Sequence, residues 1–301
     1  MDRIEAALQT SLQRATAGDA PPRLAAAMRH AVLGQGGRIR PRLCLEVAAA
    51  CGDTEPELSL AAATAIELIH NASLVHDDLP CFDDAAIRRG KPSVHAAYGE
   101  DLAVLVGDQL IVQAFAALGA VESADPRRVL ALIRVLAEAT GAPHGIIAGQ
   151  AWESEPSVDV EQYHRAKTAA LFEAAAAAGA LASGADPTPW REVGRRIGEA
   201  YQIADDLADA ASPASTLGKP TGQDLRNGVP SVVLQIGVRG ALKLLDQRLQ
   251  QAVTAVPPCE RRDDILALLG KVGLRLCPPS LRHAIEDDND DRPELHLVAA
   301  G

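Results

Sequence analysis

Apolar residues recur along this chain at intervals of three and four, the spacing that places side chains on one face of an α-helix. At the start, Ile4, Leu8 and Leu12 form such a stripe and predict an amphipathic helix over residues 2–17. Further helices are expected at 23–33, 41–51, 57–79, 101–121, 126–141, 144–151, 188–211, 231–253 and 260–276. Strand-like alternation is scarce, and no linker or change in composition divides the 301 residues. The pattern predicts an all-α protein with one domain over residues 1–301.

The longest of the early apolar runs ends in carboxylates. Asp77 and Asp78 close the run, Pro80 breaks the helix because it lacks an N–H and its ring clashes with the preceding turn, and Asp83 and Asp84 follow. On an unbroken helix Asp77 and Asp83 would point about 240° apart. The break at Pro80 is what would fold Asp83 back beside Asp77. Carboxylates that converge repel one another unless a cation lies between them, and such hard oxygen ligands suit Mg²⁺ shared with substrate phosphates.

A second acidic cluster lies far downstream, and its spacing is helical. Gly198, Gln202, Asp205 and Asp209 recur at intervals that place them on one face, with Asp206 beside them. Either cluster alone could be a solvated acidic face. Two clusters, each at the end of an apolar helical run and each followed by basic residues, indicate a metal site instead.

The formal net charge of −11 argues against nucleic acid as a partner. It would also repel a diphosphate, so metal ions and a local basic cluster must reverse the sign at any such site. The most acidic run, Glu286–Asp291, has no apolar helix behind it and no basic partners. We interpret the chain from about residue 286 as a solvated, mobile tail and not as a third metal motif.

The five cysteines, Cys44, Cys51, Cys81, Cys259 and Cys277, include no CxxC pair, which is typical of reduced thiols in a cytoplasmic protein. The first residues do not resemble a signal peptide. We expect no apolar run to approach the roughly 18 residues that span a bilayer. The sequence thus predicts a cytoplasmic protein without a transmembrane segment.

Both clusters, with the segments around them, resemble the aspartate-rich motifs of the trans-isoprenyl diphosphate synthases. The other matching segments are Gly36–Pro41, Arg88–Pro92, Gly107–Asp108, Gly149–Gln150, Lys167–Thr168 and Gly218–Asp224, in the order expected for that family. Within the family the chain looks most like the bacterial geranylgeranyl diphosphate synthases of carotenoid and photopigment pathways.

This resemblance implies a bundle of antiparallel helices around a large central cavity, the isoprenoid synthase fold. It implies a Mg²⁺-dependent, homodimeric prenyltransferase. The substrates would be isopentenyl diphosphate and an allylic diphosphate (dimethylallyl, geranyl or farnesyl), and the product geranylgeranyl diphosphate. A farnesyl diphosphate synthase remains an alternative.

The resemblance also implies roles for individual residues. Asp77, Asp83 and Asp205 would be the principal magnesium ligands, with Asp78, Asp206 and Asp209 supporting them. Arg88, Lys167 and Lys219 would hold the allylic diphosphate, and Arg40, His70 and Arg89 would hold isopentenyl diphosphate. Thr168 and Gln202 would place oxygen dipoles near the allylic cation. Ala72 and Ser73, on the turns before Asp77, would set the product length, because their small side chains leave room for a longer chain.

Three positions depart from the family pattern. Gly37 and Val229 stand where a lysine is usual, and Glu153 replaces an aspartate. Each missing lysine removes a cationic contact worth about 1–3 kcal/mol if it is not replaced, and Arg38 or Arg226 are the candidates to replace it. Because every acidic ligand is intact, we expect an active enzyme with weakened substrate affinity.

Three other classes of protein stay open at this point. A terpene cyclase usually pairs the first cluster with an Asn/Ser/Glu metal motif, which the second cluster here is not. A non-catalytic subunit of a heteromeric synthase would fit the missing lysines, but such subunits commonly lose aspartates. An all-α magnesium-dependent nucleotide diphosphohydrolase would not need the 212–235 segment.

Overall fold

The computed structural model describes residues 2–34, 36–211 and 231–287. Their main elements are α1 (Arg3–Ala15), α2 (Pro22–Val32), α3 (Ile39–Ala50), α4 (Pro56–Asp77), β1 (Ile87–Arg88), β2 (Lys91–Pro92), α5 (Val94–Tyr98), α6 (Glu100–Gly119), α7 (Pro126–Thr140), α8 (Ile146–Ala151), α9 (Val160–His164), the π-helix η2 (Arg165–Ala169), α10 (Ala170–Ala182), α11 (Thr188–Ala211), α14 (Val232–Ala255), α15 (Arg262–Leu276) and α16 (Pro279–Asp287). In these residues the only strands are the two short ones of a hairpin. The predicted all-α class is confirmed.

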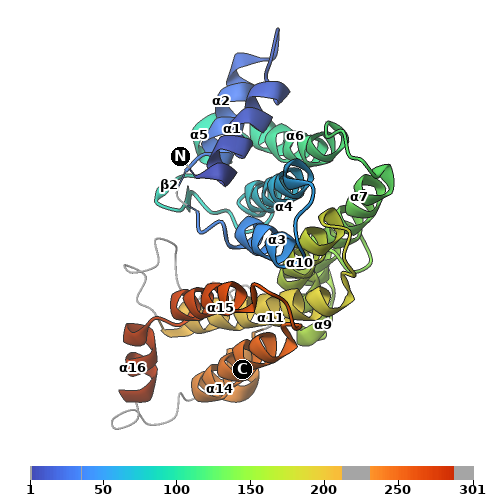
Figure 1. Ribbon diagram of the computed structural model, residues 1–301. Coiled ribbons are helices and arrows are strands. Elements are labelled where there is room, and N and C mark those ends of the chain that lie inside the picture. The colour runs from blue at the N-terminus through green and yellow to red at the C-terminus, as the bar shows by residue number, and fades with distance from the viewer. Residues whose placement is uncertain (1, 35, 212–230, 288–301) are drawn as a thin grey trace.

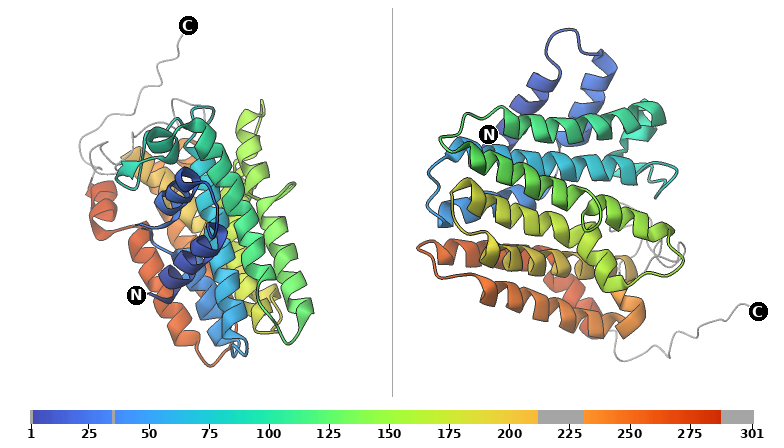
Figure 2. Two further views of the ribbon diagram at one scale, coloured as in Figure 1. Left: turned by 90° about the horizontal axis from the view of Figure 1, so that it is seen from above. Right: turned by 90° about the vertical axis from the view of Figure 1, so that its right-hand side faces the viewer.

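The long helices lie side by side in a bundle (Figure 2). Helices α1 and α2 stand at one end of the molecule and α14 and α15 toward the other, with α4 and α10 between them (Figure 1). Helix α10 packs against α3, α4, α7 and α11, and α4 packs against α3 and α6. One connected group of buried apolar residues extends from Ile4 to Ile285. This core extends through the described residues, and the single domain expected from the sequence stays a prediction.

Small residues let α10 occupy the middle of the bundle. The five alanines at 174–178 are all buried, and Gly179 lies directly against α3. A Cβ atom on Gly179 would come within 2.2 Å of the carbonyl oxygen of Cys44, so only glycine fits there. The small-residue tract therefore serves close helix packing.

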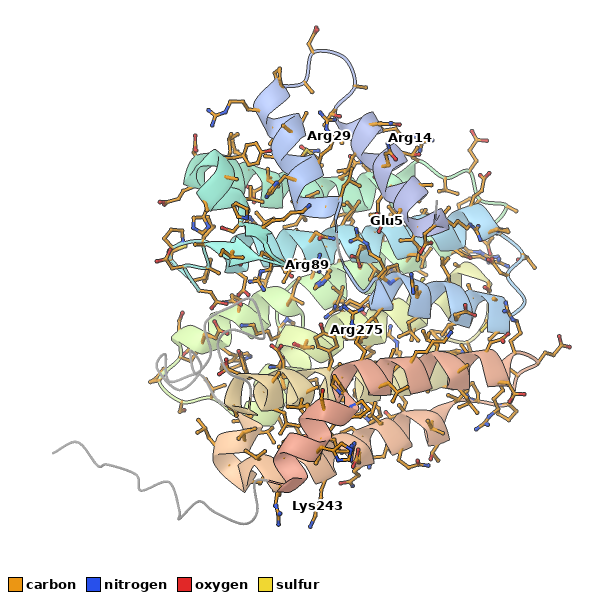
Figure 3. The ribbon with its side chains drawn as sticks, turned by 90° about the vertical axis from the view of Figure 1, so that its left-hand side faces the viewer. Glu5, Arg14, Arg29, Arg89, Lys243 and Arg275 are labelled. Carbon is orange, nitrogen blue, oxygen red and sulfur yellow. The ribbon has the colours of Figure 1, made fainter. Side chains whose placement is uncertain are left out.

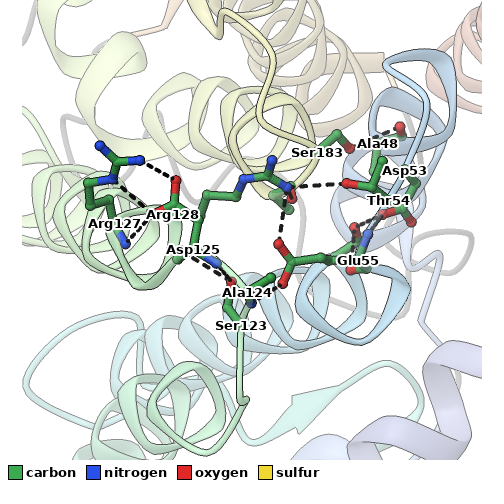
Figure 4. A network of polar contacts seen from close by, with 12 residues as sticks. Ala48, Asp53, Thr54, Glu55, Ser123, Ala124, Asp125, Arg127, Arg128 and Ser183 are labelled. Carbon is green, nitrogen blue, oxygen red and sulfur yellow. Dashed lines mark hydrogen bonds and ion pairs between the residues drawn. The ribbon is translucent and has the colours of Figure 1, made fainter.

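A polar network fastens one end of the bundle (Figure 4). The Nη1 atom of Arg128, in α7, donates to the Oε1 atom of Glu55 at 3.1 Å, to the Thr54 hydroxyl at 3.2 Å and to the carbonyl oxygen of Ala182 at 3.2 Å. One guanidinium group of α7 thereby joins the beginning of α4, which carries site residues, to the end of α10.

Several local features differ from the sequence-based elements. Helix α4 ends at Asp77 and not at residue 79, and the hairpin and α16 were not predicted. Helix α14 contains a kink at Gly237, whose φ of 71° is left-handed. Of the expected acidic tail, residues 288–301 lie outside the described part of the chain.

Two described helices, α4 and α6, are long and apolar enough to cross a membrane by length and composition alone, which corrects the expectation that no segment would be. In α4, 72% of the apolar window is buried, as in the core helix of a folded protein. In α6 the buried share is 39%, and Val104, Leu105 and Val112 are exposed. Helix α6 thus presents an apolar face.

Candidate active site

The first acidic segment turns back on itself after α4. The backbone N–H of Asp83 donates to the carbonyl oxygen of Asp77 at 3.0 Å, and that of Ala85 to the carbonyl oxygen of Asp78 at 3.1 Å. These bonds close a tight loop around Pro80. They confirm the prediction that the break at Pro80 folds Asp83 back to the end of the helix.

The carboxylates of this loop are poorly compensated. Burial and the charge of Asp77 raise the pKa of Asp83 to about 6. The Oδ1 atom of Asp77 is buried and has no hydrogen-bond partner, and the Nζ atom of Lys167 lies 3.8 Å from it. Two partly buried carboxylates with spare oxygen lone pairs are a donor set that fits Mg²⁺.

Asp78 is engaged differently from its neighbour. It is buried and accepts a hydrogen bond from Nε of Arg88 at 2.8 Å and a second from Nη2. The same Nη2 atom lies 3.7 Å from Oδ2 of Asp77. This two-pronged contact fixes Arg88 beside the acidic loop. Asp78 therefore positions a cation, although the sequence resemblance gave it a supporting role toward metal.

Lys167 approaches the loop from the π-helix η2. Its ammonium group donates to Glu153, which also accepts from the Tyr163 hydroxyl at 2.6 Å and from Nε2 of Gln150 at 2.6 Å. Although burial lowers it, the neighbouring Asp77, Tyr163 and Glu153 raise the pKa of Lys167. Glu153, at a position where aspartate is usual, thus reaches the lysine and holds it charged near Asp77.

Two glycines of the sequence motifs mark close contacts near these residues. A Cβ atom on Gly149 would lie 2.4 Å from backbone atoms of Lys167, and one on Gly107 would lie 2.0 Å from Nε2 of His76. Asp108, next to Gly107, places its Oδ1 atom 3.7 Å from the same His76 nitrogen. The glycines allow α8 and α6 to approach the elements that carry the acidic loop and its lysine.

The second acidic cluster joins three elements. The Thr168 hydroxyl donates to Oε1 of Gln202 at 2.6 Å, and Nε2 of Gln202 donates to Asp206 at 3.0 Å. Asp206 is buried and accepts from the Val232 N–H at 2.8 Å and the Ser231 hydroxyl at 3.2 Å. Asp206 therefore ties η2 and α11 to the start of α14.

The other two carboxylates of α11 are more accessible, Asp205 being exposed and Asp209 partly so. In the part of the chain that the structure describes, no three His, Cys, Asp or Glu side chains converge closely enough to hold a metal by themselves. Magnesium commonly keeps several waters and is shared between one or two carboxylates and substrate phosphates, so this arrangement suits it. Lys219, Arg226 and Val229 lie outside the described residues.

The predicted isopentenyl diphosphate residues converge on a separate, basic cavity of about 510 Å³. Nη1 of Arg40 and Nη2 of Arg89 both lie 3.4 Å from Nε2 of His70. The Arg40 guanidinium also lies 4.1 Å from the centre of the Phe172 ring. The cavity is lined by Gly36, Gly37, Arg38, Ile39, Arg40, Glu67, His70, Arg89, Tyr201 and Arg275.

His70 serves this cavity as a neutral ring. Burial, followed by the positive charges of Arg40 and Arg89, lowers the pKa of His70 well below its usual range. The neutral ring can accept the N–H groups that both arginines direct at it, whereas a protonated ring would repel them. The positive charge of the cavity thus comes from guanidinium groups.

Arg38 does not replace the missing lysine at Gly37. Its side chain is buried and lies 2.6 Å from both Glu5 and Glu67, and it also donates to the Val32 carbonyl oxygen at 2.7 Å. Instead, the cavity receives Arg275 from α15 (Figure 3). Neither periodicity nor a motif singles out Arg275 in the sequence, because packing alone brings α15 to this wall.

Fold and site together define an all-α protein with an acidic, metal-suited loop beside a basic cavity. A polyprenyl synthetase family profile matches residues 21–264. The chain is 52% identical over 276 residues to a geranylgeranyl diphosphate synthase of Cereibacter sphaeroides, covering 92% of this chain and 96% of that protein. A geranylgeranyl diphosphate synthase of Rhodobacter capsulatus is also 52% identical, over 85% of this chain and 89% of that one.

Solved structures agree with these sequence relatives. A geranyltransferase from Helicobacter pylori, complexed with magnesium and isoprenyl diphosphate, matches with a TM-score of 0.75 and 28% identity over 89% of this chain and 96% of that one. An FPP/GFPP synthase from Zymomonas mobilis matches with a TM-score of 0.76 and 31% identity over 90% of this chain and 97% of that one. The chain belongs to the polyprenyl synthetase family.

The partly buried His70 predicts a pH dependence of stability. In the unfolded chain its pKa is about 6.5. Folding favours the neutral ring, so the neutral His70 contributes to the free energy of unfolding. This contribution is complete above about pH 6.5 and is lost as the pH falls toward the lowered pKa. Relative to His70→Gln, the parent should lose up to about 1.4 kcal/mol of unfolding free energy per pH unit below that point.

Urea unfolding at about pH 7.5 and about pH 5.5 measures this difference. His283→Gln, at an exposed histidine of α16, is the matched control and should keep the pH dependence of the parent. If the parent and His70→Gln lose stability equally over this range, His70 is not held neutral by its surroundings.

Proposed function

We propose that this chain is a magnesium-dependent prenyltransferase. It condenses isopentenyl diphosphate with dimethylallyl, geranyl and farnesyl diphosphates and releases geranylgeranyl diphosphate. The observation that carries the proposal is that two sites of opposite charge lie along one helix. His70, in the basic cavity, and Asp77, in the acidic loop, are both on α4, seven residues or about 10 Å apart. The relatives at 52% identity, which are named for the same product, support the assignment.

Two consecutive arginines of the hairpin belong to different sites, and each would contact a different substrate. Arg88 contacts Asp78 and faces the acidic loop, whereas Arg89 contacts His70 in the cavity. Arg88 and Lys167, with Lys219 from outside the described residues, would hold the allylic diphosphate. Arg40, His70 and Arg89 would hold isopentenyl diphosphate, since guanidinium groups bind phosphate oxygens in pairs.

Asp77, Asp83, Asp205 and Asp209 would hold the metal ions. The hydrogen bonds of Asp78 and Asp206 favour positioning roles for those two residues. Oδ1 of Asp78 already accepts from Arg88, and both oxygens of Asp206 accept, Oδ1 from Gln202 and Oδ2 from the start of α14. Magnesium, when bound, neutralises the negative charge that develops on the departing diphosphate.

The protein's own groups then protect and guide the reaction. The buried helices around the site exclude water, which would otherwise trap the allylic cation. The oxygens of Thr168 and Gln202 are fixed relative to each other by their hydrogen bond and would stabilise the cation electrostatically. The double bond of isopentenyl diphosphate attacks the cation, and the proton then lost passes to the released diphosphate.

We further propose that two copies of the chain pair through α6. Its exposed Val104, Leu105 and Val112 form an apolar face that a second copy would cover.

The free thiols of the five cysteines suit a cytoplasmic protein. The net charge of −11 opposes binding to nucleic acid.

The test is the reaction itself. Incubation with Mg²⁺, isopentenyl diphosphate and farnesyl diphosphate should yield the C20 diphosphate, identified by mass. Asp77→Ala should lower turnover at least about 100-fold, because it removes a ligand without touching the core. Circular dichroism should show unchanged helix content. Near-parental activity of a folded Asp77→Ala protein would refute the magnesium assignment, and absence of any prenyl product from the parent would refute the function.

Product length provides a second prediction. Ala72 is buried on α4 between His70 and Asp77, and Ser73 beside it is less buried. If the growing chain runs along this helix, a larger side chain there should end elongation early. Ala72→Tyr should shift the main product from C20 toward C15 while magnesium dependence remains.

Ser73→Phe probes the same wall from a less buried position, in case tyrosine at the 72 position prevents folding. Product analysis by chromatography, with thermal unfolding as the check on folding, decides the question. A folded variant of either kind that still makes mainly C20 would place the floor of the pocket elsewhere.

A further inference from the structure

Position 37 is unusual in the basic cavity because it carries no side chain, although the residues around it are cationic. A Cβ atom built on Gly37 would lie 2.6 Å from both Cζ and Nη1 of Arg275 and 2.9 Å from its Nη2. All three atoms belong to the guanidinium group. The charged end of Arg275 therefore occupies the space into which a side chain at position 37 would extend.

The positive charges around this guanidinium group favour the binding of an anion. Arg40, Arg89 and Arg275 all line the cavity, and the one carboxylate in its lining, Glu67, is bonded to Arg38 at 2.6 Å. Among the described residues Arg275 forms no ion pair with a carboxylate. Figure 3 shows Arg275 and Arg89 on the same side of the molecule, and both residues line the cavity. Three guanidinium groups without a counter-charge repel one another unless an anion lies between them.

The end of α15 holds Arg275 in place. Its neighbours Leu276 and Cys277 are buried, and so is Val272 one turn earlier. Arg275 itself points away from this buried side and is exposed. Its backbone is thus anchored by packing while its charged end stays available to a ligand.

We propose that Arg275 binds the diphosphate of the isopentenyl substrate, in the space left by the missing side chain of Gly37. This inference rests on the proposed function. It explains how the chain can lack the usual lysine in the Gly36–Pro41 segment and still hold a diphosphate. A guanidinium from the C-terminal helix supplies the charge, with Arg40 and Arg89 on the other walls of the cavity.

The first test is a set of single variants on α15. Arg275→Gln should raise the KM for isopentenyl diphosphate at least about tenfold, the loss expected for one charge-assisted contact. The KM for the allylic diphosphate and kcat should stay within about twofold. Arg275→Lys should recover part of the lost affinity for isopentenyl diphosphate, because it restores the positive charge without the paired N–H donors of a guanidinium group.

Lys271→Gln is the matched control. It removes one positive charge from the same helix, one turn earlier, at an exposed residue that does not line the cavity. It should leave the KM for isopentenyl diphosphate unchanged. A folded Arg275→Gln protein with a KM within about twofold of the parent, or an equal rise for Lys271→Gln, would overturn the proposal.

A second test asks whether positions 37 and 275 share one space. Gly37→Lys alone should not improve the KM, because its side chain would meet the Arg275 guanidinium. Combined with Arg275→Ala, the same lysine should restore most of the affinity that Arg275→Ala loses. A double variant no better than Arg275→Ala would show that the two side chains do not substitute for each other.

Direct binding separates this inference from the proposed function. Calorimetric titration of the parent and Arg275→Gln with inorganic diphosphate reports on the contact without any turnover. If the parent makes no prenyl product, the proposed function fails. Even then, tenfold weaker binding of inorganic diphosphate by Arg275→Gln than by the parent would support the contact between Arg275 and diphosphate. Equal binding by the two proteins would overturn it even if the parent is an active synthase.

Discussion

Carboxylates gathered at the end of a buried helix lose hydration and repel one another, and the rest of the site is arranged around this cost. At the end of α4, Asp78 is neutralised by a two-pronged contact with Arg88, and Asp77 lies near Lys167. The compensation is incomplete: burial and the charge of Asp77 raise the pKa of Asp83, and the buried Oδ1 atom of Asp77 accepts no hydrogen bond. The remaining negative charge is what a divalent cation would neutralise, so the same imbalance that strains the free protein favours the metal-bound one.

The hairpin after this loop divides the charge between two neighbouring sites. Arg88 belongs to the acidic side and Arg89 to the basic cavity, so a one-residue step along the chain separates the sites. This division also answers the difficulty posed by a net charge of −11 for a diphosphate-binding protein. In the cavity the local charge is set by guanidinium groups, with His70 kept neutral by burial and by the arginines themselves. The bundle as a whole can be acidic while the lining of this cavity is basic.

The sequence predicted those features that depend on local periodicity. The helices follow from apolar spacing, and the return of Asp83 toward Asp77 follows from the break at Pro80, since both are short-range consequences of backbone chemistry. Contacts between segments that are distant in the sequence could not be predicted from it. Asp78 and Asp206 look like metal ligands in the sequence, but each already accepts hydrogen bonds from an element that packing brings to it. Likewise Arg38 was a candidate for replacing a lysine, whereas two carboxylates hold it and Arg275 reaches the cavity instead.

The central claim is that the two diphosphates are held by different means, one by the protein's arginines and the other through metal on the carboxylates. The most direct measurement is calorimetric titration of the parent protein, with Mg²⁺ and with a chelator, using isopentenyl diphosphate and an unreactive allylic analogue in which sulfur replaces the bridging oxygen. We expect the affinity for isopentenyl diphosphate to change by less than about threefold when the metal is removed, whereas binding of the allylic analogue should be lost. Equal dependence of both ligands on Mg²⁺, or metal-free binding of the allylic analogue, would contradict it.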